Sequence, residues 1–130
     1  MHFPIALLSL ALPADLIGFW RGDPFWHTAA FWALAAGLLT ALPTAATGLA
    51  DFAALPKEHL AESVAFRHML VMLTAVSIYT ASLLARTWGA HGLLISDALA
   101  AAGQLVLIFG AWLGGELVFR HHLGMVPDRR

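Results

Sequence analysis

Cysteine is absent from the 130-residue chain. The chain therefore forms no disulfide, and it offers no thiolate for metal binding or for nucleophilic catalysis. Charge is also scarce, because only 12% of the residues are Asp, Glu, Lys or Arg, against about 25% in ordinary soluble domains. With a net charge of -1 and no basic stripe, the sequence excludes nucleic acid as a partner.

Hydrophobic residues take the place of the missing charge. They make up 60% of the chain, against about 45–50% in soluble domains. A chain this apolar and this short is typical of a single domain that has the lipid bilayer as its solvent. We therefore expect one membrane domain over residues 1–130.

Four apolar runs are long enough to cross a bilayer, which takes about 20 residues as a helix. They cover residues 3–20, 25–50, 64–84 and 93–119. We expect the third to belong to a helix starting near Pro56, because proline suits a first helical turn. We expect the first to be retained rather than cleaved as a signal peptide, because no basic residue precedes it. Short connections make neighbouring helices antiparallel, so the sequence predicts an all-α, antiparallel four-helix transmembrane bundle.

Basic residues predict the orientation of this bundle. Four spans place both termini on one side of the membrane, and that side carries Lys57, Arg67, Arg120, Arg129 and Arg130. The opposite side carries Arg21 and Arg86. Because loops rich in Lys and Arg stay in the cytoplasm, we expect both termini to be cytoplasmic.

Small residues recur on two of the spans. Ala33, Gly37 and Ala41 repeat at every fourth position, and Gly103, Gly110 and Gly114 repeat at heptad-like spacing. Such stripes let helix backbones approach closely in lipid. We interpret them as helix-packing surfaces, with a surface for a flat cofactor as the alternative.

Ionisable residues from all four spans gather on the side of the termini. They are His2, Asp51, Arg67, His68, Glu116, Arg120 and His121. In a four-helix bundle these residues can form one layer, and ionisable groups at membrane depth are candidates for function. The alternative for the Glu116 carboxylate is a local ion pair with Arg120, four residues later on the same helix face.

Two cofactor chemistries fit such a layer. A low-spin haem b needs two imidazoles from different helices, and His68 and His121 are the best pair, with His2 as a third candidate. Arg67 or Arg120 would then bind a propionate. A zinc, iron or copper ion takes imidazoles and carboxylates, from a pool of His2, Asp51, His68, Glu116 and His121. The spacing of these residues matches no specific metal or haem motif, so the cofactor stays open.

Two further carboxylates, Asp15 and Asp97, lie at least one turn inside the opposite face. Their possible partners are Arg21, His27, Arg86 and His91. We interpret them as structural ion pairs between helices rather than as a proton relay, because few polar groups lie in the middle of the spans. Those groups are Thr74, Ser77, Thr80, Ser82 and Gln104, which are too few for an aqueous channel or a transporter of charged substrates.

Several segments resemble one family over nearly the whole chain. They are the opening His2-Phe3-Pro4-Ile5-Ala6-Leu7-Leu8 with Asp15, then Thr47-Gly48-Leu49-Ala50-Asp51-Phe52, Arg67-His68 and Gly114-Gly115-Glu116-Leu117-Val118-Phe119-Arg120-His121. The family is the bacterial four-helix membrane proteins catalogued as domain of unknown function twenty-two thirty-one. The resemblance implies a bacterial inner membrane. Its members stand beside Rieske-type or cytochrome-type redox domains, which implies redox partners. The chain departs from the family pattern at His122 and Leu123 and in its shorter start.

These observations lead to two hypotheses for function. The first is a small membrane redox subunit that binds haem b or a transition metal at the layer of histidines and carboxylates. The second is a non-catalytic structural or assembly subunit of a larger membrane complex. In both cases we expect a protein that is not an enzyme on its own.

Overall fold

The computed structural model describes residues 2–55, 61–88 and 90–120, and of residues 2, 90 and 91 it describes only the backbone. Every regular element in these residues is helical. The elements are α1 (His2–Arg21), α2 (Pro24–Ala54), α3 (Glu62–Ala85), the short 3-10 helix η1 (Arg86–Trp88) and α4 (Ala90–Phe119). The third helix is described from Glu62, and the start expected near Pro56 lies outside the described residues.

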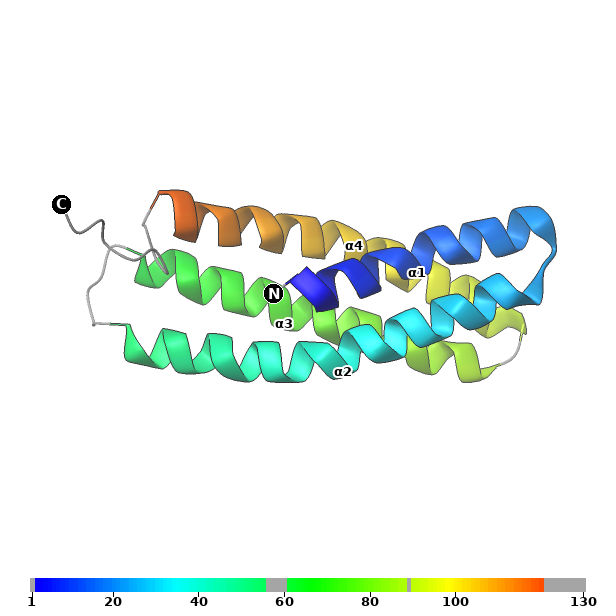
Figure 1. Ribbon diagram of the computed structural model, residues 1–130, viewed down its shortest axis with the longest axis horizontal. Helices are drawn as coiled ribbons and strands as arrows, with labels where there is room; N and C mark the ends of the chain where they lie inside the picture. Colours follow the sequence, from blue (N-terminus) through cyan, green and yellow to red (C-terminus); the bar gives the residue numbers. More distant parts are fainter. Residues whose placement is uncertain (1, 56–60, 89, 121–130) are drawn as a thin grey trace.

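Consecutive helices run in opposite directions and form one bundle (Figure 1). All four are long and apolar enough to cross a membrane, which confirms the predicted all-α four-helix fold. The α1–α2 turn and η1 lie at the same end of the bundle (Figure 1), which we call the hairpin end. At the opposite end, which we call the tail end, α2 and α4 finish and α3 begins.

Local sequence explains the tight turn at the hairpin end. Gly22 has φ 64, a left-handed conformation that glycine adopts without steric cost. The carboxylate of Asp23 then accepts a hydrogen bond from the Phe25 backbone N–H at 3.0 Å, and so caps the start of α2. Pro24 occupies the first turn of α2, where its missing N–H costs no helical hydrogen bond.

Unequal helix lengths shape the tail end. Helix α1 has 20 residues and α2 has 31, and the two are joined by a short turn at the hairpin end. Helix α2 therefore runs about 16 Å beyond the start of α1 at 1.5 Å per residue. Figure 1 shows α1 starting part-way along the bundle. The tail end is consequently built from α2, α3 and α4.

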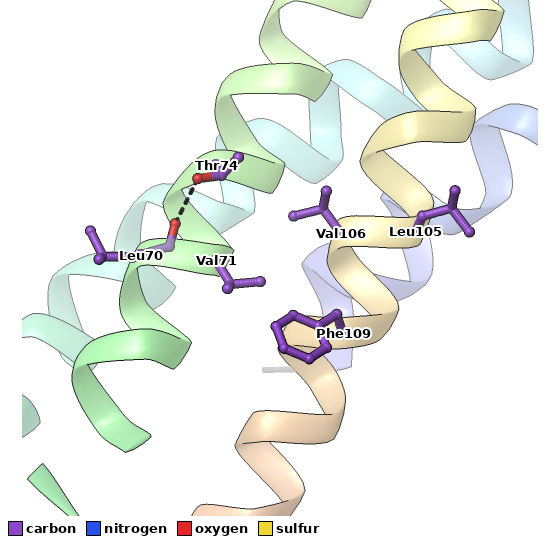
Figure 2. Close-up of a pocket in the computed structure, with 6 residues that line it drawn as sticks. All are labelled: Leu70, Val71, Thr74, Leu105, Val106 and Phe109. Atoms are coloured by element: carbon purple, nitrogen blue, oxygen red, sulfur yellow. Dashed lines mark hydrogen bonds between the residues drawn. The ribbon is translucent and has the colours of Figure 1, made fainter. Parts of the chain in front are cut away.

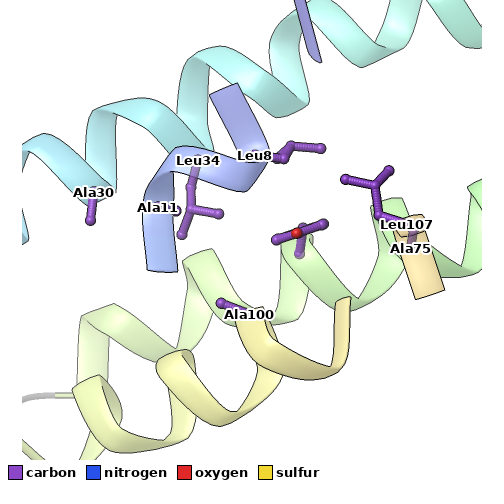
Figure 3. Close-up of a cluster of buried hydrophobic side chains, with 8 residues drawn as sticks. Leu8, Ala11, Ala30, Leu34, Ala75, Ala100 and Leu107 are labelled. Carbon is purple, nitrogen blue, oxygen red and sulfur yellow. The ribbon is translucent and has the colours of Figure 1, made fainter. Parts of the chain in front are cut away.

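The core is narrow because small residues fill much of it. Figure 3 shows the central cluster, to which all four helices contribute; it comprises Leu8, Ala11, Ala30, Leu34, Ala75, Tyr79, Ala100 and Leu107. A Cβ atom on Gly37 would lie 2.8 Å from Leu8 Cγ, and one on Gly103 would lie 3.2 Å from the Tyr79 ring. Gly37 and Gly103 thus lie at close helix contacts, as the packing interpretation predicted.

Large apolar side chains cover the outside of the bundle. Trp32, Leu39, Leu105 and Trp112 are each more than 60% exposed. A water-soluble protein rarely leaves so continuous an apolar surface uncovered, whereas lipid tails solvate it. The outer surface therefore supports the membrane location that the helix lengths indicate.

Candidate functional site

Histidine 68 is the one imidazole of the predicted tail-end layer whose side chain the structure describes. It projects from α3 toward α4, where its Nδ1 lies 2.9 Å from the carbonyl oxygen of Gly110. Its ring also packs against Gly114, since a Cβ atom there would lie 3.1 Å from His68 Cε1. Because a carbonyl only accepts hydrogen bonds, Nδ1 carries the proton and Nε2 is left as the basic nitrogen of the neutral ring.

Two of the charged residues predicted for the same layer, Arg67 and Arg120, bond to residues four positions earlier in the chain. Arg67 is exposed, and its Nε donates to the Ser63 carbonyl at 3.2 Å. Arg120 is 76% exposed and donates to Glu116 Oε1 at 2.9 Å. Asp51 is exposed near the end of α2. The Glu116–Arg120 pair is therefore the local i,i+4 ion pair that was the alternative to a cofactor ligand.

The start of α1 lies at a different level from the rest of the predicted layer. Leu8 of α1 packs against Gly37 of α2, so the antiparallel helices bring His2 level with a position near residue 43. Asp51 is eight residues farther along α2, which is about 12 Å at 1.5 Å per residue. His2 and Asp51 consequently do not share one level, and this part of the expectation is wrong because it assumed helices of equal length. His121 lies outside the described residues.

A second group of ionisable residues is buried at the hairpin end, where each helix or the turn that follows it contributes one side chain. Asp15 of α1 is fully buried. Both terminal nitrogens of Arg86, which belongs to η1, donate hydrogen bonds to the Asp15 carboxylate. The bond from Nη1 to Oδ1 is 3.1 Å long. His27 of α2 places Nδ1 at 2.9 Å from the same Oδ1. Asp97 of α4 lies 3.8 Å from the Arg86 guanidinium. We call Asp15, His27, Arg86 and Asp97 the hairpin-end cluster.

The cluster confirms the predicted ion pairing between helices, but its two carboxylates are not equally well paired. Asp15 accepts charged hydrogen bonds from both Arg86 and His27, whereas neither oxygen of Asp97 has a hydrogen-bond partner among the described residues. The Nε of Arg86 is likewise buried and unpartnered there. The carboxyls of Asp97 and Asp15 both approach the same nitrogen of Arg86, Nη2, and so lie near each other.

Close packing holds the imidazole of His27 against α1. A Cβ atom on Gly18 would lie 2.8 Å from His27 Cε1, so only glycine leaves room for the ring. The Phe19 ring meets it edge-on, with the centroids 5.1 Å apart. Gly18 follows Asp15 by three residues and lies on the same face of α1. That face therefore supplies both the hydrogen-bond acceptor for the His27 ring and the space that the ring fills.

The sequence contained a signal for this cluster. The buried positions of α1 are Pro4, Leu8, Ala11, Asp15 and Gly18, which alternate in steps of four and three and mark the inward face of the helix. Asp15 occupies a core position of that stripe. His27 and Arg86 were named as possible partners of the two carboxylates. Residue spacing alone predicts neither the bidentate bond to Asp15 nor the lack of a hydrogen bond at Asp97. Arg21 is exposed at the end of α1, and the His91 side chain is not described.

Polar contacts continue from the cluster along the α3–α4 interface and then stop. The buried hydroxyl of Ser82 donates to the Ser96 carbonyl at 2.8 Å and lies 2.9 Å from the Ser96 hydroxyl. Farther on, Tyr79 Oη donates to Gln104 Oε1 at 2.9 Å. The remaining mid-span hydroxyls of α3 bond to carbonyls of their own helix, and they belong to Thr74, Ser77 and Thr80. The described middle of the bundle thus has no continuous polar path, in line with the exclusion of a channel.

An apolar groove of about 410 Å³ lies on the outer surface between α3 and α4 (Figure 2). It is lined by Leu70, Val71, Thr74, Leu105, Val106 and Phe109. The one polar side chain, Thr74, turns its hydroxyl to the Leu70 carbonyl at 2.9 Å, as the dashed line in Figure 2 shows. The groove presents no free polar group to a ligand and is suited to apolar chains.

Comparison with known families gives one result. Residues 1–127 match the model of a family described as predicted membrane protein (DUF2231). The chain belongs to this family. The match confirms the resemblance seen in the sequence and, with the four apolar helices, supports an integral membrane protein. Neither the comparison with curated proteins nor that with solved structures gave a match.

Within this DUF2231 protein, two places remain as chemical candidates. Among the side chains that the structure describes, no three of the types His, Cys, Asp or Glu converge in a metal-binding geometry. At the tail end, His68 offers one nitrogen. At the hairpin end, Asp15 binds both a guanidinium and an imidazole, and a second carboxylate, Asp97, lies 3.8 Å from the guanidinium. The hairpin-end cluster is the more completely assembled of the two.

Proposed function

We propose that this membrane protein binds and releases a proton at Asp97, as a proton-handling subunit that is not an enzyme on its own. One observation carries the proposal: both oxygens of the buried Asp97 carboxyl lack a hydrogen-bond partner among the described residues, although Asp97 and Asp15 approach the same nitrogen of Arg86. A proton between the two carboxyls supplies the missing hydrogen bond. It also removes a charge from an apolar setting, where an unpaired charge is very costly.

The charge balance of the cluster supports the same conclusion. Two carboxylates, Asp15 and Asp97, face the single guanidinium of Arg86, so one negative charge remains when His27 is neutral. Arg86 binds Asp15 in the bidentate geometry that suits a carboxylate. The excess charge therefore falls on Asp97, which is 3.8 Å from Arg86. Carboxylates that share a site in this way commonly share one proton.

Position in the bundle limits the role to one face of the membrane. The cluster lies at the hairpin end, and the polar contacts that lead from it along α3 and α4 end at Tyr79 and Gln104. Beyond them, the interface contains Met72, Ala75 and Leu107. A proton taken up at Asp97 would thus return to the same face or pass to a partner subunit. This position fits a component of a larger membrane assembly better than a free-standing transporter.

Infrared spectroscopy of the protein in lipid nanodiscs tests the proposal. A carboxyl C=O stretching band of a buried, protonated aspartate should appear as the pH is lowered, and Asp97→Asn should abolish it. Asp51→Asn is the matched control, because the exposed Asp51 at the tail end should leave the band unchanged. A wild-type protein with no titrating buried carboxyl, or a band that persists in Asp97→Asn, would refute the proposal.

A second candidate function rests on the tail end. The hydrogen bond from His68 Nδ1 to the Gly110 carbonyl is the arrangement that commonly orients a metal-binding imidazole, with Nε2 as the ligand atom. We propose as the alternative that His68 and His121 bind haem b or a transition metal, making the protein a redox subunit. Arg67 and Arg120 would then bind a haem propionate, and Glu116 is a further candidate ligand.

An absorption spectrum decides this second candidate. Protein purified from cells supplied with haem and metals should show a reduced b-type band after dithionite, or stoichiometric metal on elemental analysis. His68→Ala and His121→Ala should each remove the cofactor, while His59→Ala should retain it. A colourless, metal-free wild-type protein, or a cofactor that survives in both variants, would overturn the assignment.

A further inference from the structure

The four residues of the hairpin-end cluster differ in their access to water. The exposed fraction of the side chain is 25% for His27, against 0% for Asp15, 7% for Arg86 and 13% for Asp97. His27 also lies in the first turn of α2, next to the turn that connects α1 and α2. Of the described titratable groups that contact Asp15 and Asp97, His27 is therefore the one with the best access to the aqueous face.

From this geometry we infer that His27 is the relay residue through which Asp97 exchanges its proton with water at the hairpin end. The inference rests on the function proposed for Asp97. It adds the route and assigns a positioning role to Gly18. An imidazole suits the role because it can gain a proton at one nitrogen while it gives one up at the other.

The atoms define the transfer. His27 Nδ1 lies 2.9 Å from Asp15 Oδ1, and because a carboxylate only accepts, Nδ1 carries the hydrogen. Nε2 then has a free lone pair, which can take a proton from water. The imidazolium gives its Nδ1 proton to Asp15, and Asp15 passes a proton to the neighbouring Asp97. The net change is one proton moved from water to Asp97. The reverse sequence, in which Asp97 releases its proton through Asp15 to Nδ1 and Nε2 returns one to water, restores the Nδ1–H form of His27.

The residues around the His27 ring hold it in one position beside Asp15. Asp15 and Phe19 of α1 contact it from one side of the helix, and Gly18 leaves the space that it fills. The charged groups that face the cluster from the other elements are Arg86 and Asp97. Arg86 is fixed by its bidentate bond with Asp15 and does not lose its proton in proteins, so it cannot carry the relay.

Time-resolved infrared spectroscopy after laser release of protons from a caged acid tests the inference. In His27→Gln, the Asp97 carboxyl band should reach its full amplitude at low pH but rise about 100-fold more slowly, a typical loss for a removed proton-transfer group. Added imidazole should restore the rate in His27→Gln and leave the wild type unchanged. A purely structural role of His27 predicts no such rescue.

A second variant covers the case in which His27→Gln does not fold. Gly18→Ala displaces the His27 ring and should slow proton uptake by Asp97. Gly115→Ala on α4 should not slow it, because its Cβ atom would meet only Phe119 at 3.9 Å. Proton uptake at the wild-type rate in the folded variants would overturn the relay and leave the Asp97 proposal standing. A wild-type protein without a titrating Asp97 band would overturn both.

Discussion

The two ends of this bundle use charged residues in opposite ways. At the hairpin end, Asp15, Arg86 and Asp97 are buried and belong to three different helices or their turns. At the tail end, Arg120 is mostly exposed and pairs with Glu116 in its own helix. A charge pair between helices in an apolar setting fixes how those helices are arranged, whereas an exposed i,i+4 pair contributes little. Charge near the membrane face therefore indicates function only where the packing has removed it from water.

This contrast also explains how the four helices are held together. Helix α1 packs mainly on α2, and α3 packs mainly on α4, so the protein consists of two helical hairpins. The bond between Asp15 and Arg86 joins one hairpin to the other. At the tail end α1 is absent; Arg67 bonds to Ser63 of its own helix, and Arg120 pairs with Glu116 four residues earlier. The hairpin end thus contributes both the proposed proton site and the polar connection between the two halves.

The largest expected effect comes from the same substitution made at each end. Arg86→Met leaves two buried carboxylates without their guanidinium and should lower the free energy of unfolding by about 3–5 kcal/mol. Arg120→Met removes an exposed pair and should cost less than about 1 kcal/mol. Reversible unfolding in mixed micelles measures both values. Equal losses would contradict the distinction between the two ends.

A double substitution sharpens this prediction. Asp15→Leu together with Arg86→Met removes the buried charge pair as a whole, and it should recover part of the stability that Arg86→Met loses, because one buried carboxylate instead of two is left without a guanidinium. If the double variant is as unstable as the sum of the two single variants, the two side chains do not act as a pair.

Glycines on α4 provide the next comparison. A Cβ atom on Gly92 at the hairpin end would lie 2.0 Å from the Ala85 carbonyl oxygen, just before Arg86. Gly92→Ala should therefore cost about 1–3 kcal/mol through overpacking. Gly115→Ala at the tail end should be neutral or stabilise the helix by up to about 1 kcal/mol. Thermal unfolding in detergent separates the two outcomes, and a Gly92→Ala protein as stable as wild type would show that η1 adjusts freely.

The sequence predicted the fold because hydrophobic run length and turn composition determine helix number and direction. The sequence was less accurate about how deep each residue lies along the bundle. Counting inward from each helix end placed His2 level with Asp51, although α1 is 11 residues shorter than α2. The sequence also named Asp15, Asp97, His27 and Arg86 as partners. It did not predict which carboxylate is left without a hydrogen bond, because that depends on how each helix is rotated about its axis in the packed bundle.

The smallest expected effect tests whether neutral polar groups, like charged ones, contribute more to stability when they bond between helices than within one helix. Ser82 of α3 bonds to Ser96 of α4 near the cluster, whereas Thr80, two residues earlier, bonds to Val76 of its own helix and is exposed. Ser82→Ala should cost about 0.6 kcal/mol, the average for a hydrogen bond between helices in a membrane protein. Thr80→Ala should change the free energy of unfolding by less than that. If Thr80→Ala proves the more costly of the two, hydroxyl bonds between α3 and α4 do not stabilise the hairpin end, and its stability rests on the charged cluster and the packing of small residues.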